Sequence, residues 1–192
     1  MKKIEEYYKN TKNALPHKNV LEFIEIEKKV GKAIDLGCGA GRDTIYLIKN
    51  GWDTIAIDRE YTKQIITSRL NDKELEKFKF VQSNFESIKL EKNNLVIANY
   101  SIPFCKKDKL FDFWNEIVNS IEKDGYFVGN FFGKNDEWNN ERSEITFLDK
   151  EEVKKLFNKF DILKFEEEEK DSKTGLEIIK HWHTYNIIAR KK

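Results

Sequence analysis

The sequence predicts a single α/β domain with a doubly wound, mainly parallel sheet. Short apolar runs alternate with segments of helical spacing, a glycine-rich stretch follows the first run, and two long strand-like runs close the chain. Strands that alternate with helices imply right-handed crossovers and helices on both faces of the sheet. The sequence contains no internal repeat and no linker, so we expect residues 1–192 to form one domain.

The first two thirds of the chain supply the alternation. Asn19 to Val30 has helical spacing and precedes Gly31, and glycine commonly follows a helix end. Strands are predicted over residues 32–36, 52–57, 79–82, 94–98 and 126–132. Helices are predicted between them over residues 42–50, 61–71 and 108–121.

The last third predicts a helix and a hairpin. Asp149, with Glu152 three residues later, is a capping box for a helix that runs to about Lys159. The runs 161–169 and 177–190 are strand-like, and K-D-S-K-T-G separates them. Turn residues at this place predict a hairpin, which makes the last strand antiparallel to its neighbour.

Composition limits the class of partner. Charged residues make up 36% of the chain and the net charge is +1, so no overall field attracts nucleic acid or an anionic membrane. No run reaches the roughly 18 apolar residues of a membrane span, and the N-terminal M-K-K-I-E-E-Y-Y has no signal-peptide core. With Cys38 and Cys105 as the two cysteines, we expect no disulfide framework, a reducing cytoplasm and a small-molecule partner, in a monomer or homodimer.

The stretch D-L-G-C-G-A-G-R, residues 35–42, holds three of the nine glycines. A strand, such a loop and then a helix bring backbone close to a ligand. The spacing of Gly37, Gly39 and Gly41 is not the G-x-G-x-x-G of a dinucleotide site, which argues against a nicotinamide-dependent oxidoreductase. Asp35 would repel a pyrophosphate but could face the ammonium group of S-adenosylmethionine. Asp58, at the next strand end, could accept hydrogen bonds from both ribose hydroxyls.

Residues 34–42 and 56–58 resemble the first two motifs of class I S-adenosylmethionine-dependent methyltransferases. P-H-K-N-V-L-E-F, the stretch from G-K-A-I-D-L-G-C-G to W-D-T-I-A-I-D, and the ending I-I-A-R-K-K are similar to the tellurite-resistance methyltransferase family. The resemblance implies a seven-stranded Rossmann-like sheet with a C-terminal antiparallel hairpin. It also implies methyl transfer from S-adenosyl-L-methionine to a small molecule such as a thiol or chalcogen oxyanion, with S-adenosyl-L-homocysteine as product. A catalytically silent S-adenosylmethionine-binding regulatory protein is the alternative.

We expect the cofactor at the carboxyl ends of the parallel strands, where open α/β sheets bind ligands. After the third strand this fold usually offers an acidic residue to the adenine amino group. Asn84 can accept that hydrogen bond and Phe85 could support the ring, although Asn84 could also be an ordinary loop residue. The fourth strand ends in A-N-Y-S-I-P-F, without the prolines of enzymes that methylate exocyclic amines of nucleic-acid bases. The predicted cofactor-binding residues are Asp35, Gly37, Cys38, Gly39, Arg42, Asp58, Arg59, Asn84, Phe85, Asn99, Tyr100 and His17.

Two further segments are expected near this site. Residues 1–30, with Tyr7, Tyr8 and His17, are predicted to form a helical segment that folds over the cofactor as a lid. The loop F-F-G-K-N-D-E-W, residues 131–138, lies beyond the fifth strand on the same side. Its aromatic residues either wall the acceptor cavity and the sulfonium or serve as core and lid packing.

K-H-W-H, residues 180–183, places two histidines on one face of a strand. We predict His183 and His181 as catalytic residues, acting as a base or orienting an anionic acceptor. A satisfied surface pair is the alternative. No metal is predicted, because no third His or Cys lies near in sequence. The resembling family has His and Arg residues in this region, whereas this chain has F-E-E-E-E-K and His183, which puts tellurite as substrate in doubt.

Overall fold

The computed structural model describes residues 2–192. Its strands are β1 Lys32–Leu36, β2 Asp53–Asp58, β3 Phe78–Gln82, β4 Asn93–Ala98, β5 Ile121–Gly133, β6 Phe147–Leu148, β7 Phe160–Lys173 and β8 Ile179–Lys191. Its α-helices are α1 Lys2–Thr11, α2 Lys18–Ile26, α3 Arg42–Lys49, α4 Lys63–Thr67, α5 Asp72–Leu75, α6 Lys107–Ser120 and α7 Lys150–Leu156, and two short 3-10 helices are η1 Ile102–Phe104 and η2 Glu137–Asn140.

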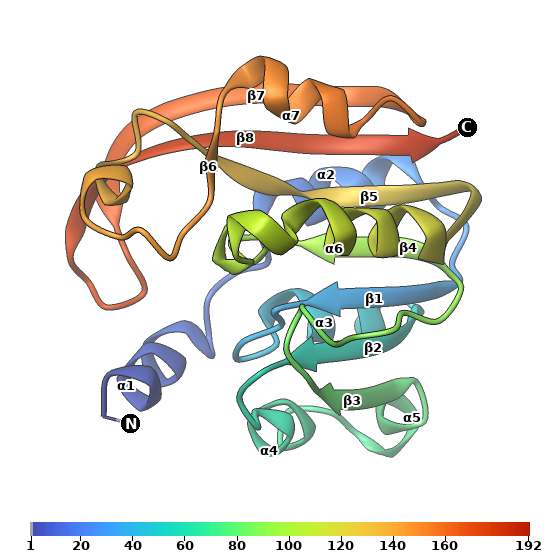
Figure 1. The fold of residues 1–192 in the computed structure, drawn as a ribbon. Coiled ribbons are helices and arrows are strands. Elements are labelled where there is room, and N and C mark those ends of the chain that lie inside the picture. Colours follow the sequence, from blue (N-terminus) through green and yellow to red (C-terminus); the bar gives the residue numbers. More distant parts are fainter. Residues whose placement is uncertain (1) are drawn as a thin grey trace.

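The strands form one mixed sheet in the order β3-β2-β1-β4-β5-β8-β7, with β6 paired to β5 beside this path. Strands β1 to β5 run parallel, and β8 is antiparallel to both β5 and β7. Figure 1 shows the carboxyl ends of β1, β2 and β4 pointing toward α1 and the glycine loop. The predicted α/β fold with its C-terminal antiparallel hairpin is confirmed, and the two-residue β6 brings the sheet to eight strands.

Apolar layers cover both faces of the sheet. Trp114 of α6 packs on Phe127 of β5 and Phe157, with ring centroids 5.0 and 4.9 Å apart. On the other face, Val128 and Ile188 belong to the cluster built around α2 and α3. Because successive strand residues point to opposite faces, odd-numbered residues of β5 and β8 face α6 and even-numbered ones face α2. Each fully buried aromatic or aliphatic side chain contributes roughly 1.5–3 kcal/mol.

Three predicted helix ends differ in the structure. Helix α2 ends at Ile26 because Glu27 is extended, so Gly31 does not cap it. The predicted helix over 61–71 is wrong, since α4 covers only Lys63–Thr67. Asn71 has φ −83° and ψ 173° and forms a capping box with Glu74 at the start of α5, so no helix continues through it. The capping box of Asp149 and Glu152 at α7 is confirmed, although α7 ends at Leu156.

The hairpin and its surroundings also differ in extent. Strand β7 continues to Lys173, so the turn spans residues 174–178 and most of K-D-S-K-T-G is strand. Strand β5 begins at Ile121, where it pairs with Asn93.

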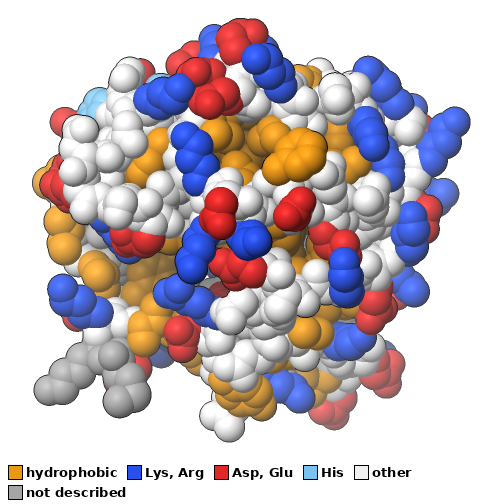
Figure 2. All heavy atoms as spheres, viewed as in Figure 1, with side chains coloured by type: hydrophobic (Ala, Val, Ile, Leu, Met, Phe, Trp, Pro, Cys, Tyr) orange, Lys and Arg blue, Asp and Glu red, His pale blue; other side chains and the backbone are white. Residues whose placement is uncertain are grey.

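None of the helices within residues 2–192 has the length and apolar character that crossing a membrane requires. Acidic and basic side chains are interspersed on the face shown in Figure 2.

Candidate cofactor and acceptor site

The three glycines after β1 all have left-handed backbone, with φ of 71° at Gly37, 52° at Gly39 and 80° at Gly41. A Cβ at Gly37 would lie 2.5 Å from Cβ of Ser101, and one at Gly41 would lie 2.5 Å from Cγ1 of Ile66. A Cβ at Gly39 would meet only the ring of Tyr8, at 3.8 Å. Protein packing therefore requires the first and third glycines, whereas the middle glycine leaves space beside the loop.

Asp58, at the end of β2, holds the glycine loop. Its Oδ2 accepts a hydrogen bond from the Gly39 N–H at 2.8 Å, and its Oδ1 accepts one from the Glu60 N–H at 2.9 Å. Burial raises the pKa of Asp58. Each carboxylate oxygen keeps a second acceptor position, so the group can receive two further hydroxyl donors beside the open Gly39.

Asp35 lies buried at the end of β1 beneath the same loop. Its Oδ2 accepts a hydrogen bond from Oγ1 of Thr44 at 2.6 Å. Burial, and then the neighbouring carboxylate of Asp43, raise the pKa of Asp35 to about 7. A cationic ligand group would favour the ionised form, so binding of an ammonium group here would be coupled to loss of a proton.

A buried polar network centred on Asp43 joins the loop to the N-terminal segment. Its Oδ1 accepts from the backbone N–H of His17 at 2.7 Å, and its Oδ2 accepts from Nδ2 of Asn99 at 2.9 Å. Nδ2 of Asn19 donates to Oδ1 of Asn186 at 3.3 Å. The network ties α3, the start of α2, the end of β4 and β8 together. Asp43, Asn19 and Asn186 are not among the residues predicted from the sequence.

His17 is a neutral donor at this site. It caps α2 through Nδ1, which accepts from the Asn19 N–H at 3.2 Å. Burial, then the charges of Arg42 and Lys18, lower the pKa of His17 to about 3, so its Nε2 carries the proton. Its ring lies edge-on to Tyr100, with centroids 5.3 Å apart. Among the residues that the structure describes, the His17 Nε2, the Tyr100 hydroxyl and the Arg42 terminal nitrogens make no hydrogen bond.

Helix α1 lies between the glycine loop and the turn of the hairpin, as Figure 1 shows. Tyr8 approaches Gly39, and Nδ2 of Asn10 donates to the carbonyl of Gly175 at 3.2 Å. The guanidinium of Arg69 donates to the carbonyls of Lys12 and Ala40, and so links the end of α1 to the glycine loop. The lid predicted for residues 1–30 stays a prediction, since α1 lies beside the glycine loop whereas Val20 and Phe23 of α2 are buried in the core.

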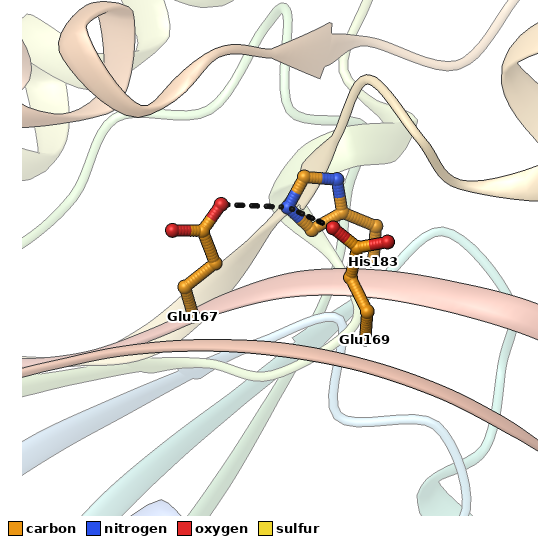
Figure 3. A group of neighbouring side chains, drawn as sticks. All are labelled: Glu167, Glu169 and His183. Atoms are coloured by element: carbon orange, nitrogen blue, oxygen red, sulfur yellow. Dashed lines mark hydrogen bonds and ion pairs between the residues drawn. The ribbon is translucent and has the colours of Figure 1, made fainter.

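The geometry argues against His183 as a catalytic base. Its Nδ1 accepts the N–H of Asn135 at 3.1 Å, so its Nε2 carries the proton and donates to Oε1 of Glu167 at 3.1 Å (Figure 3). No ring nitrogen is left to accept a proton. His183 also points to the α6 side of β8, whereas the neighbouring Asn186 contacts the polar network on the other face. The catalytic role of His183 stays a prediction that this arrangement does not favour, and the strand pattern alone does not reveal which face meets the site.

His183, Glu167 and Glu169 bring one ligand atom each within 4.8 Å of one another (Figure 3). A metal would need the lone pair of Nε2 and would have to displace its proton. In this structure Nε2 donates to Glu167 and lies 3.8 Å from Oε1 of Glu169. His181 lies on the same face as predicted, with Nδ1 2.8 Å from Asp171 and Nε2 3.3 Å from Glu169, and these hydrogen bonds raise the pKa of His181. It is exposed and makes no contact with Tyr100 or His17 in the described part of the chain.

The remaining predicted residues lie around the loop in different ways. Phe85 stacks on Phe113 with centroids 4.7 Å apart and approaches Gly37, while Asn84 is exposed. The thiol of Cys38 packs inward, 3.8 Å from Oγ1 of Thr62. The side chain of Arg59 is exposed and lies 3.6 Å from Glu60. The Cys38 thiol therefore points away from the open side of Gly39.

The family model described as Tellurite resistance protein TehB matches residues 1–176. The chain belongs to the TehB family. The crystal structure of TehB from Haemophilus influenzae superposes with a TM-score of 0.78 and 17% identity, over 92% of this chain and 62% of that one. The chain thus spans about 62% of the length of that TehB. No curated protein sequence matches it.

Two other methyltransferase structures share the fold of this TehB-family chain, and both contain S-adenosylhomocysteine. The 1,6-didemethyltoxoflavin-N1-methyltransferase of Burkholderia thailandensis has a TM-score of 0.69 and 16% identity, covering 91% of this chain and 76% of that one. The N-methyltransferase NodS of Bradyrhizobium japonicum has a TM-score of 0.69 and 12% identity, covering 93% of this chain and 89% of that one.

Proposed function

We propose that this protein transfers the methyl group of S-adenosylmethionine to a nucleophilic atom of a small molecule. The observation that carries the proposal is the pairing of Asp58 with Gly39, which leaves acceptor positions of a carboxylate beside bare, accessible backbone at the end of β2. The two ribose hydroxyls fit these acceptor positions. Membership of the TehB family and the methyltransferase fold support the same activity.

The other ends of the cofactor have matching groups. The Asp35 carboxylate suits the ammonium of the methionine part, directly or through water. Phe85, which approaches Gly37, can support the adenine, and Asn84 can accept from its amino group. Tyr8 of α1 would cover the cofactor from outside. Two free, buried cysteines fit the reducing cytoplasm that the composition predicts.

The acceptor belongs beside Tyr100 in this proposal. The free donors at His17 Nε2, Tyr100 and Arg42 favour an anionic acceptor, such as a thiolate or a chalcogen oxyanion. A soft nucleophile of this kind needs little help from a base. This agrees with His183, whose two ring nitrogens are both engaged in hydrogen bonds. Holding donor and acceptor in line can contribute up to roughly 7–11 kcal/mol to catalysis.

Product analysis tests the proposal. The full chain is incubated with S-adenosylmethionine and a panel of thiols, selenite, tellurite, amines and phenols, and S-adenosylhomocysteine and methylated acceptor are quantified by mass spectrometry. We expect both products in equal amount with at least one thiol or chalcogen acceptor, and neither with Asp58→Ala. Binding of S-adenosylhomocysteine without turnover of any acceptor would instead support the silent regulatory alternative. The glycine spacing leaves a nicotinamide-dependent oxidoreductase as the weaker alternative.

A further inference from the structure

Five aromatic rings form a continuous surface on the α2 side of the sheet, next to the proposed acceptor position. We call this surface the aromatic wall. Trp182 lies at its centre, with ring centroids 5.2 Å from Tyr100, 5.4 Å from Trp138 and 5.7 Å from Phe132. Phe104 completes it, 6.5 Å from Trp138. The rings come from the segment after β4 and from η1, β5, η2 and β8, so only the folded chain assembles the wall.

The aromatic wall is partly open. Tyr100, Trp138 and Trp182 are half-buried, and Phe104 is 38% exposed. Single exposed rings such as Phe111 are ordinary on a protein surface, but adjoining partly exposed rings beside a polar site are typical of ligand surfaces. Tyr100 belongs both to the wall and to the group of free donors. A ligand that meets the donors therefore also meets the wall.

A buried ion pair stands behind the aromatic wall. Nζ of Lys180 lies 3.9 Å from the ring centroid of Trp182 and 4.2 Å from that of Trp138, and it pairs with the buried carboxylate of Asp136. Oδ1 of Asp136 also accepts from the N–H of Trp138 at 3.1 Å. Desolvation offsets much of the attraction in such a pair, so it adds little net stability. Its effect is positional, because it fixes Trp138 of η2 beside Trp182 of β8.

The charges around the aromatic wall determine which ligand it favours. Besides Lys180, the guanidinium of Arg142 lies 5.0 Å from the centroid of Trp138 and 5.9 Å from that of Phe104. A cation draws π electrons toward itself, so the remaining ring surface becomes poorer in electrons. Such rings stack best on electron-rich partners, and a cationic ligand would be repelled by Lys180 and Arg142.

We propose that the acceptor is a planar, electron-rich aromatic anion, with an aryl thiolate as the favoured class, whose ring stacks on the aromatic wall. This inference rests on the proposed function. The thiol first loses its proton to solvent, because aryl thiols ionise readily. A sulfur lone pair of the thiolate then forms the new bond to the methyl carbon. The old carbon–sulfur bond breaks and its electron pair stays on the cofactor sulfur, so a neutral thioether and neutral S-adenosylhomocysteine result.

The test compares two acceptors for the full chain, the electron-rich aromatic 4-methoxythiophenolate and the aliphatic 2-mercaptoethanol. We expect the aromatic thiolate to have the higher kcat/KM, although it is the less basic nucleophile. Trp182→Leu and Trp138→Phe should lower kcat/KM for the aromatic thiolate about tenfold more than for the aliphatic thiol. The control Phe111→Leu, on the exposed side of α6, should change neither.

Binding supplies the second measurement. 4-Methoxythiophenolate is titrated into the protein loaded with S-adenosylhomocysteine, and tryptophan fluorescence is followed. We expect saturable quenching that weakens in Trp182→Leu and in Trp138→Phe. An equal loss for both thiols in the variants, or no saturable binding at millimolar 4-methoxythiophenolate, would overturn the inference. Failure of the proposed function looks different, because then S-adenosylhomocysteine would not bind, or would bind while the wild type turned over neither thiol.

Discussion

The N–H of Tyr100 donates a hydrogen bond to Oδ1 of Asn130 at 2.8 Å, and Tyr100 has a left-handed φ of 52°. A non-glycine residue in this region costs of order 1–3 kcal/mol, and such strain persists where the surroundings impose it. Here the fully buried Asn130 imposes it from the neighbouring strand β5. The resulting bend after β4 brings the Tyr100 ring to His17 on one side and Trp182 on the other.

Asn130→Ala should lower both stability and activity. The Tyr100 N–H would lose its acceptor, which costs about 1–3 kcal/mol of unfolding free energy when the group is buried. The ring would also lose its fixed place beside the acceptor position, so kcat/KM should fall while S-adenosylhomocysteine still binds. Urea denaturation and product analysis measure the two effects. Asn119→Ala, at an exposed asparagine of α6, is the control and should change neither. Wild-type stability of Asn130→Ala would contradict the account.

Gly39→Ala and Gly51→Ala separate backbone strain from ligand contact. Both glycines have positive φ, 52° and 94°, and neither has a close neighbour that blocks a Cβ. Each substitution should cost about 1–2 kcal/mol of unfolding free energy. Only Gly39→Ala should also weaken S-adenosylhomocysteine binding, by about tenfold or more. Equal affinities of the two variants in calorimetry would show that the open side of Gly39 does not face the cofactor.

Affinity for S-adenosylhomocysteine should rise with pH through the pKa of Asp35. Because that pKa is raised to about 7, the carboxyl is protonated below neutral pH and must lose its proton to bind an ammonium group. Affinity should fall by up to about tenfold per pH unit below this value. Calorimetry from about pH 6 to about pH 8 measures it. Asp35→Asn should bind weakly without this pH dependence, and an equally flat wild-type profile would exclude Asp35 from the ammonium site.

The raised pKa of Asp35 also makes the unfolding free energy of the unliganded protein depend on pH. Asp35 ionises at lower pH in the unfolded chain than in the folded one, since its ordinary pKa is 3.8. The unfolded state therefore gains relative stability as pH rises from about 4 to about 7. We expect Asp35→Asn to remove this contribution, so that the unfolding free energy of the variant exceeds that of the wild type most clearly above neutral pH.

His183→Ala should reduce stability and leave turnover of the folded protein intact. Its buried ring accepts the Asn135 N–H and donates to Glu167, and loss of these bonds costs about 1–3 kcal/mol. Gly133→Ala places a Cβ 2.2 Å from the His183 ring and should be more harmful. The double variant Gly133→Ala, His183→Ala should recover part of the unfolding free energy that Gly133→Ala loses. Urea denaturation measures this coupling. Lost turnover in folded His183→Ala would restore the catalytic prediction.

The sequence predicted the parts of the fold and site that local pattern determines. The end of a buried strand fixes where Asp35 and Asp58 lie, and the Asp149 cap is a local motif. Strand periodicity correctly placed His181 and His183 on one face. It could not say which face, because that depends on the register that sets His183 opposite Gly133 and Thr184 opposite Phe132.

Other site residues depend on contacts between distant segments. Asp43 meets Asn99 from 56 positions away, and Asn19 meets Asn186 from 167. The sequence does mark two of the buried polar residues, because Asn130 interrupts the apolar run Y-F-V-G-N-F-F and Asn186 interrupts Y-N-I-I. A polar residue inside a buried strand must find a partner or a ligand. The sequence marked Tyr100 and the aromatic residues of 131–138 as neighbours of the acceptor, but it could not show that Phe104 and Trp182 join them, because these rings come from distant segments.

Calorimetric titration of the full chain with S-adenosylhomocysteine tests the central claim most directly. We predict one binding site per chain, and loss of the binding heat in Asp58→Ala with the fold intact by circular dichroism. Asp53→Ala, at the opposite end of β2, should bind like the wild type. Absence of binding heat and of any thermal shift at millimolar ligand in the wild type, or unchanged affinity in Asp58→Ala, would contradict the account.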